Sequence, residues 1–282
     1  MSVVFKTPEA GETVRALYRR VLDAWPVPHD EARIPTRQGE TFVLSCGPKD
    51  APALVLLHGA QSNIAAWAAD AALWSNHFRI HAIDMIGEAG FSAEVRPALD
   101  DDAHALWLDD VLDGLGVARA AFAGVSLGGW LALDYAMRRP ARVERLALLC
   151  PAGVGAQKNF LAVALPLMLL GPWGMKKVRE LVFGPAPKVV PDGAKPFVEL
   201  MGAINRGIKP RVVKIPTLSD AALAALPPTL VIVGGRDVMI DSVQTRDRLA
   251  RAKPDAEIVF LPEGRHFMPG QGPRILDFLR QA

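Results

Sequence analysis

The chain of 282 residues contains only two cysteines and six histidines, and both shortages restrict its chemistry. Cys46 and Cys150 lie far apart and form no Cys-x-x-Cys pair, which argues against a zinc site and against a disulfide framework. Each stands in an apolar, strand-like run and is interpreted as a small buried residue. We therefore expect no metal ion in the functional site.

The sequence also lacks a charge excess and a long apolar run. A formal net charge of +2 gives no reason to expect a nucleic-acid partner. The apolar run 160–173, FLAVALPLMLLGPW, is interrupted by Pro166 and Gly171 and is shorter than the roughly 20 residues of a spanning helix. It predicts a buried or interfacial helix without stable membrane insertion. The N-terminus has no basic region followed by an apolar stretch, so we expect no signal peptide and a cytoplasmic protein.

Hydrophobic residues make up 50% of the chain, enough for a large core. Amphipathic helical patterns alternate with aliphatic, strand-like runs at 53–57, 78–83, 120–125, 143–149, 229–233 and 257–261. A helix at 12–25 and two strands within 33–47 come before this alternation. Repeated strand–helix units predict an α/β fold with a mostly parallel sheet and helices on both faces.

Three parts follow from this pattern. Residues 1–30 form an N-terminal helical arm, and residues 31–151 and 216–282 form the α/β core. The alternation breaks down at 152–215, which is rich in proline and glycine and is interpreted as a helical cap insertion. Its basic residues outnumber its acids: Lys176, Lys177, Arg179, Lys188, Lys195, Arg206, Lys209, Arg211 and Lys214. We favour a solvated outer face over attraction to an anionic substrate or membrane surface.

The segment Gly124-Val125-Ser126-Leu127-Gly128 matches the pattern Gly-x-Ser-x-Gly. A strand-like run precedes it and a helical pattern follows it. A turn that exposes a serine between a strand and a helix is strained and brings backbone segments close together, so its flanking positions need glycine. This context predicts that Ser126 is a nucleophile, although an ordinary tight turn is the simpler alternative.

A nucleophilic serine needs a base, and the base needs an orienting carboxylate. His266 is the preferred base because it follows the last predicted strand in a glycine-containing loop. Asp237 follows the preceding strand and is the preferred acid, while Asp241 is close enough to rival it. His58 is interpreted as shaping its own turn, and Asp84 as bonding nearby backbone.

Acyl transfer also requires stabilisation of an oxyanion by backbone N–H groups. Leu127, at the start of the predicted helix, and Ala60, just after His58-Gly59, are the candidate donors. The side chain of Gln61 is an additional candidate. Gln61, Met239 and Phe267 are candidate residues of the substrate pocket.

The order Ser126, Asp237, His266, with a His-Gly turn at 58–59, resembles the α/β-hydrolase superfamily of serine hydrolases, and DMIGEAGFS at 84–92 is similar to carboxylesterase-like bacterial members. The resemblance covers about 33–282. It implies an α/β-hydrolase fold with an eight-stranded, mostly parallel sheet, a nucleophile elbow at Ser126, a cap and no cofactor. Serine at the elbow argues against dehalogenase and epoxide hydrolase members, which carry aspartate there.

The expected function is therefore a carboxylesterase that acts on a small, hydrophobic substrate through a Ser-His-Asp catalytic triad and an acyl-enzyme. A carbon–carbon bond hydrolase or lactonase on the same triad is an alternative, as is a ligand-binding protein that has lost catalysis. The sequence does not identify the substrate or the oligomeric state.

Overall fold

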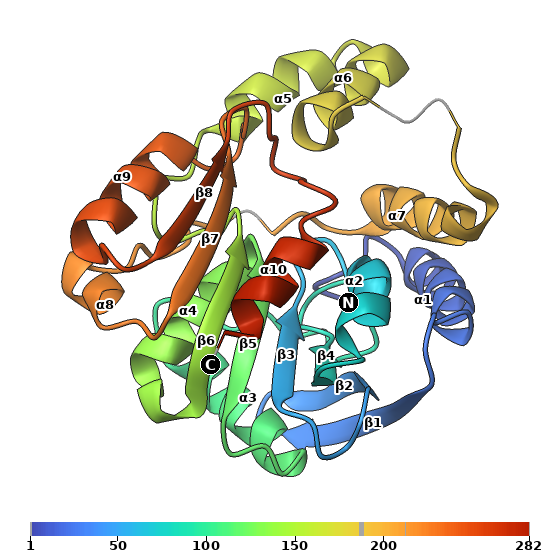
Figure 1. Cartoon of the computed structure of the whole chain (residues 1–282). Coiled ribbons are helices and arrows are strands. Elements are labelled where there is room, and N and C mark those ends of the chain that lie inside the picture. The colour runs from blue at the N-terminus through green and yellow to red at the C-terminus, as the bar shows by residue number, and fades with distance from the viewer. Residues whose placement is uncertain (1, 186–188, 212, 282) are drawn as a thin grey trace.

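The computed structural model describes residues 2–185, 189–211 and 213–281. One eight-stranded sheet organises the molecule, in the order β1-β2-β4-β3-β5-β6-β7-β8 (Figure 1). Its strands are β1 (His29–Thr36), β2 (Gly39–Cys46), β3 (Ala53–Leu57), β4 (Arg79–Ile83), β5 (Ala120–Val125), β6 (Val143–Leu149), β7 (Thr229–Gly234) and β8 (Glu257–Leu261). The β1–β2 and β2–β4 pairs are antiparallel and the other pairs are parallel, which confirms the prediction of a mostly parallel sheet.

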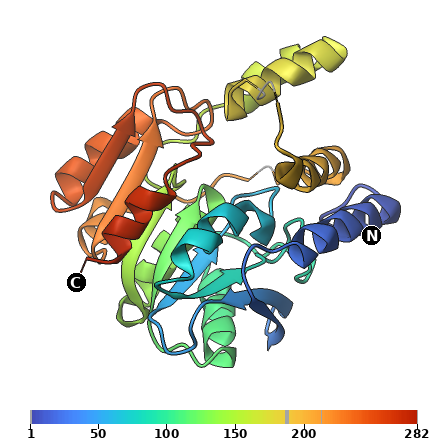
Figure 2. The same ribbon diagram turned by 45° about the vertical axis from the view of Figure 1, so that its right-hand side comes forward.

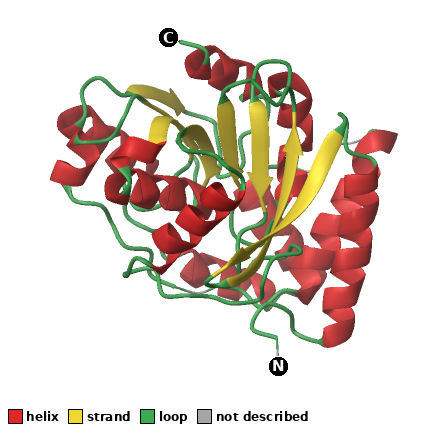
Figure 3. Ribbon diagram, turned by 90° about the horizontal axis from the view of Figure 1, so that it is seen from below, coloured by secondary structure: helices red, strands yellow, loops and turns green. Residues whose placement is uncertain are grey.

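Helices cover both faces of the sheet (Figure 3). Leu54 and Leu56 of β3 point into one apolar cluster, with α1 (Pro8–Asp23), η1 (Ile64–Trp67), α2 (Ala68–Trp74) and α10 (Gly272–Leu279). Val55 and Leu57 point into the other, with α3 (Ala103–Gly114), α4 (Leu127–Arg138), α8 (Asp220–Ala224) and α9 (Ser242–Ala252). Because side chains alternate along a strand, a continuous aliphatic run serves both clusters.

Several element boundaries differ from the prediction. Helix α1 begins at Pro8 because the Thr7 side chain accepts a hydrogen bond from Ala10 N–H and proline suits a first helical turn. Strand β1 begins at His29, so the predicted arm of 1–30 contributes its end to the sheet. The helical segment between β3 and β4 is divided into η1 and α2. Asp101 accepts a hydrogen bond from Ala103 N–H, and α3 begins only there.

The described residues of 152–215 add no strand to the sheet. They form α5 (Phe160–Met168), α6 (Gly171–Phe183), η3 (Asp192–Ala194) and α7 (Lys195–Gly207), with Lys188 outside the described residues. Helix α7 packs along α1, and α5 packs against α6. Both views show the α5–α6 hairpin beyond the sheet, apart from α7 (Figures 1 and 2). None of the described helices is both long and apolar enough to cross a membrane.

Candidate active site

Ser126 lies in a sharp turn between β5 and α4. Its φ of 53° and ψ of −109° place a non-glycine residue in a strained region of the backbone map. Ser126 N–H donates to Leu149 O at 2.9 Å, which fixes the turn against β6. A Cβ at Gly124 would come within 2.6 Å of Gly128 O, and one at Gly128 would overlap the carbonyl oxygens of Leu57 and His58. The two glycines therefore allow the close approach that exposes Ser126 at the edge of the sheet.

Asp237 and His266 meet in the loops that follow β7 and β8. Asp237 Oδ2 lies 2.8 Å from His266 Nδ1. Asp237 Oδ1 accepts hydrogen bonds from the N–H groups of Met239 (2.7 Å) and Ile240 (3.0 Å), and the residue is only 2% exposed. The carboxylate is thus fixed by the backbone and directed at one nitrogen of the imidazole.

The other candidates for the acid and the base, Asp241, Asp84 and His58, bond to other partners. Asp241 caps α9 by accepting a hydrogen bond from Gln244 N–H at 2.9 Å. Asp84 is fully buried and accepts hydrogen bonds from Ile64 N–H, Phe91 N–H and the Tyr18 hydroxyl. His58 Nε2 accepts from Met85 N–H at 3.0 Å, and burial lowers the pKa of His58 to about 4, so its ring is neutral. These three side chains hold loops together.

Cys150 is a neighbour of His266 that the sequence analysis missed. It follows β6 with a φ of 39°, its Sγ lies 3.9 Å from His266 Nε2, and the thiol donates to His266 O at 3.0 Å. Burial favours the neutral imidazole, but the Cys150 sulfur and Asp237 outweigh it and raise the pKa of His266 to about 10. Its position in the sequence could have predicted this contact, because Cys150 directly follows β6, which pairs in parallel with the strand that precedes Ser126.

Ser126 and His266 come to the same edge of the sheet, but the structure shows no hydrogen bond between these two described residues. His266 Nε2 is directed at Cys150 instead. Catalytic hydrogen bonds are often long in ligand-free enzymes and tighten in the substrate complex. The structure thus brings Asp237 and His266 into contact and leaves the Ser126–His266 link open.

A metal ion could also find ligand atoms here. Among the described residues, the group with suitable donor atoms is Cys150, Asp237 and His266. One ligand atom from each lies within 4.8 Å of the others. The carboxylate is already engaged by two backbone N–H groups and the imidazole, and the thiol donates to His266 O. Their contacts therefore fit a hydrogen-bonded set.

The candidate oxyanion donors lie at the starts of two loop-to-helix connections. Leu127 N–H belongs to the first turn of α4, where N–H groups have no intrahelical acceptor. Ala60 precedes Gln61, which has a φ of 55°. Gln61 N–H donates to Glu88 Oε2 at 2.7 Å, so its own N–H is engaged. Glu88 is 1% exposed and lies 3.7 Å from the buried Arg211 guanidinium.

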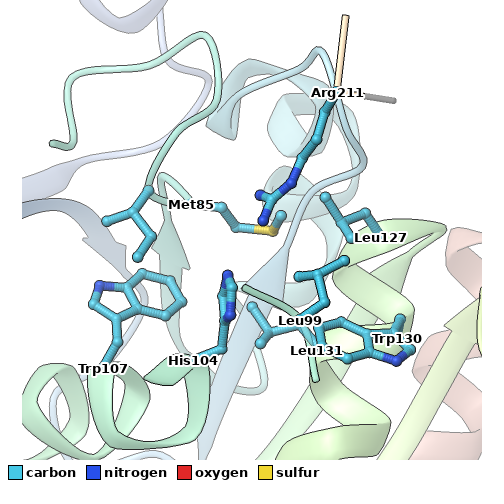
Figure 4. A pocket seen from close by; sticks show the side chains of 9 residues that line it. Met85, Leu99, His104, Trp107, Leu127, Trp130, Leu131 and Arg211 are labelled. Carbon is cyan, nitrogen blue, oxygen red and sulfur yellow. The ribbon is translucent and has the colours of Figure 1, made fainter. Parts of the chain in front are cut away.

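A small enclosed cavity lies behind this loop, between α3, α4 and Arg211 (Figure 4). Leu127, Met85 and His104 are among its lining residues, and Arg211 points into it. Its volume of about 10 Å³ has room for about one water molecule and not for a substrate. The cavity is therefore too small to be the substrate pocket.

The candidate pocket residues differ in position. Phe267 is half-exposed and lies against Phe183 of α6, with ring centroids 5.9 Å apart. Met239 is partly buried beside Asp237, to which its N–H donates. Gln61 is partly buried in the loop that follows β3. Phe267 thus connects the His266 loop to the α5–α6 hairpin.

Comparisons with known proteins found similar sequences and folds. The model of the "Alpha/beta hydrolase family" matches residues 54–276. Carboxylesterase YbfK of Bacillus subtilis (strain 168) is 38% identical over 151 residues, 54% of this chain and 51% of that protein, so the chain aligns with about half of this relative. The uncharacterized carboxylesterase nap of the same strain is 30% identical over 262 residues, 91% of this chain and 87% of that protein. The crystal structure of naproxen esterase (carboxylesterase NP) from Bacillus subtilis has a TM-score of 0.80 at 28% identity, covering 98% of this chain and 95% of that chain.

Proposed function

Because this chain belongs to the alpha/beta hydrolase family, we propose that it is a serine hydrolase that cleaves carboxylic esters of small, hydrophobic molecules. The observation that carries the proposal is the 2.8 Å contact between Asp237 and His266 at the sheet edge where the strained turn exposes Ser126. The names of the carboxylesterase relatives support the ester as substrate class.

In the proposed reaction Ser126 Oγ attacks the carbonyl carbon of the ester while His266 Nε2 accepts the hydroxyl proton. Asp237 keeps the other ring nitrogen protonated and stabilises the imidazolium. The N–H groups of Leu127 and Ala60 bind the oxyanion, each contributing about 3 kcal/mol. His266 returns the proton to the leaving alcohol, and water then cleaves the acyl-enzyme with His266 again as the base.

Catalysis in this scheme requires His266 Nε2 to exchange its sulfur neighbour for the Ser126 hydroxyl. The base must also be neutral when it accepts the proton, whereas Cys150 and Asp237 raise its pKa. In the proposed reaction the bound ester completes the Ser126–His266 contact.

We also propose that residues 152–215 form a cap on the core of 31–151 and 216–282, with 1–30 as an arm. Helix α6 reaches the loop of His266 through Phe183 and Phe267, which are both half-exposed. Aromatic and aliphatic side chains at this place favour an apolar acyl or alcohol group. A panel of esters of graded chain length tests the preference, and faster hydrolysis of small charged esters would contradict it.

The nucleophile is tested by labelling the protein with a fluorophosphonate and repeating the experiment with Ser126→Ala. Labelling of the wild type alone is the expected result. Persistent labelling of the variant would remove Ser126 from its role, and an unlabelled wild type would favour a ligand-binding protein. Labelling without ester hydrolysis would direct attention to lactones or carbon–carbon bonds.

A further inference from the structure

We propose that the α5–α6 hairpin, residues 159–184, is a docking surface for anionic lipid membranes. The hairpin would lie on the surface of the bilayer without crossing it. This inference does not depend on the proposed ester hydrolysis, because it concerns where the protein binds and not which bond it cleaves.

The first observation is a patch of exposed apolar side chains on the two helices of the hairpin. At the turn between the two helices, Leu169 is 88% exposed, Leu170 58% and Trp173 57%. Further exposed apolar side chains continue along both helices: Leu161, Val163, Leu165, Met168 and Met175. Single exposed hydrophobic residues are normal, but so many on one pair of helices mark a site of interaction with a protein or a membrane.

The two helices of the hairpin pack closely on each other. Gly174 of α6 is packed so closely against Leu167 O that a Cβ there would overlap it. Ala164 is the buried residue of α5, while Gly174 and Val182 are those of α6. Because α5 is apolar around its whole circumference, packing it on α6 still leaves an apolar face outside. Figures 1 and 2 show this hairpin projecting beyond the sheet.

The charges of the hairpin indicate what binds to its exposed apolar side chains. The hairpin carries three basic residues, Lys176, Lys177 and Arg179, and one acidic residue, Glu180. Lys177 pairs with Glu180 at 2.8 Å and also lies over the ring of Trp173, 5.9 Å from its centroid. Apolar residues next to lysine, arginine and tryptophan are typical of segments that lie in the interface of an anionic bilayer. A second copy would bring the same positive charges together across a two-fold axis, which disfavours it.

The hairpin is also directly connected to the candidate active site. Phe267 N–H donates to Val182 O at 3.3 Å, and the Arg265 guanidinium donates to Leu181 O at 3.2 Å. These contacts lie on either side of His266 in sequence. Docking through the hairpin would therefore turn the His266 edge of the sheet toward the lipid.

Vesicle flotation tests the proposal without any substrate. We expect the partition of the full chain to rise roughly tenfold from phosphatidylcholine vesicles to vesicles with equal parts of phosphatidylglycerol. The gain should fall in about 0.5 M sodium chloride, where exposed charges are screened. Leu169→Glu should weaken binding at least about tenfold. Val243→Glu, which adds the same charge at a half-exposed residue of α9, should leave it unchanged.

Three outcomes would overturn the inference. The wild type fails to float with either vesicle, or Leu169→Glu and Val243→Glu behave alike, or the patch mediates a dimer that Leu169→Glu dissociates while no vesicle is bound. Circular dichroism establishes that both variants are folded. Since flotation and fluorophosphonate labelling are separate measurements, failure of one proposal is distinguishable from failure of the other.

Discussion

Replacing Glu88 is expected to damage both the stability and the rate of the enzyme. Its carboxylate accepts a hydrogen bond from Gln61 N–H at 2.7 Å and lies 3.7 Å from Arg211, whose side chain is only 4% exposed. Glu88→Ala would leave a partly buried N–H and a buried cation without the Glu88 carboxylate. The unpaired N–H costs about 1–3 kcal/mol, and breaking a buried ion pair from one side costs about 3–5 kcal/mol.

These two costs overlap, and Arg211 retains a hydrogen bond to Pro97 O at 3.1 Å. We therefore expect Glu88→Ala to lower the free energy of unfolding by about 3 kcal/mol. Gln61 holds a left-handed conformation, which costs a non-glycine residue about 1–2 kcal/mol. Without its acceptor the loop would relax and displace Ala60 N–H, so kcat should fall by about 10–100-fold with little change in KM.

Urea unfolding and ester hydrolysis by the folded protein measure the two effects. Glu88→Gln keeps an acceptor for Gln61 N–H and should recover much of kcat while stability remains reduced. Glu94→Ala is the matched control, because Glu94 pairs with Arg15 at 3.0 Å at a partly exposed site and should cost no more than about 1 kcal/mol. Wild-type kcat in Glu88→Ala would refute the argument that Glu88 positions the oxyanion loop.

Three further changes follow from the same structure. Gly128→Ala would push a methyl group into the carbonyl oxygens of Leu57 and His58 and should cost about 100-fold in kcat, whereas Gly193→Ala, which meets nothing within 4 Å, should be neutral in the same assay. Cys150→Ala removes the sulfur that raises the pKa of His266, so the acidic limb of the kcat/KM profile should move to lower pH; an unmoved limb would contradict this. Burial lowers the pKa values of His58, His81 and His104 from 6.5 to about 4, so their contribution to stability is complete above pH 6.5 and is lost toward pH 4. Asp70 and Asp84, whose pKa values burial raises from 3.8 to about 6, act in the opposite direction, as does His266 with its raised pKa of about 10, and urea unfolding should show a net loss of roughly 2 kcal/mol between about pH 7 and pH 5.

The fold was predictable from the sequence because its signals are local. Aliphatic runs mark strands buried on both faces, and β3, β5, β6 and β8 have the predicted bounds. Helix starts were less predictable, since they depend on single side-chain hydrogen bonds. Thr7 extends α1 toward the N-terminus, while Asp101 holds residues before α3 outside the helix. Such bonds compete with helix formation without leaving a periodic pattern.

The sequence predicted that the candidate site residues follow the ends of strands, but it did not predict which side chains contact one another. The sequence favoured Asp237 but left Asp241 as a rival, and only three-dimensional contact shows that Asp237 bonds His266 while Asp241 caps α9. Glu88 was overlooked because its partners, Gln61 and Arg211, are distant in sequence. Cys150 was judged by residue type, although its position after β6 places it beside His266.

The loop of His266 joins the two proposals, because it is held from both sides. On the core side, Asp237 and Cys150 contact the residue itself. On the other side, Arg265 and Phe267 donate hydrogen bonds to carbonyl oxygens of α6. A displacement of α6 therefore acts on the same loop that must turn His266 Nε2 from Cys150 toward Ser126. It follows that a membrane or substrate bound at the hairpin would influence catalysis through the orientation of one imidazole.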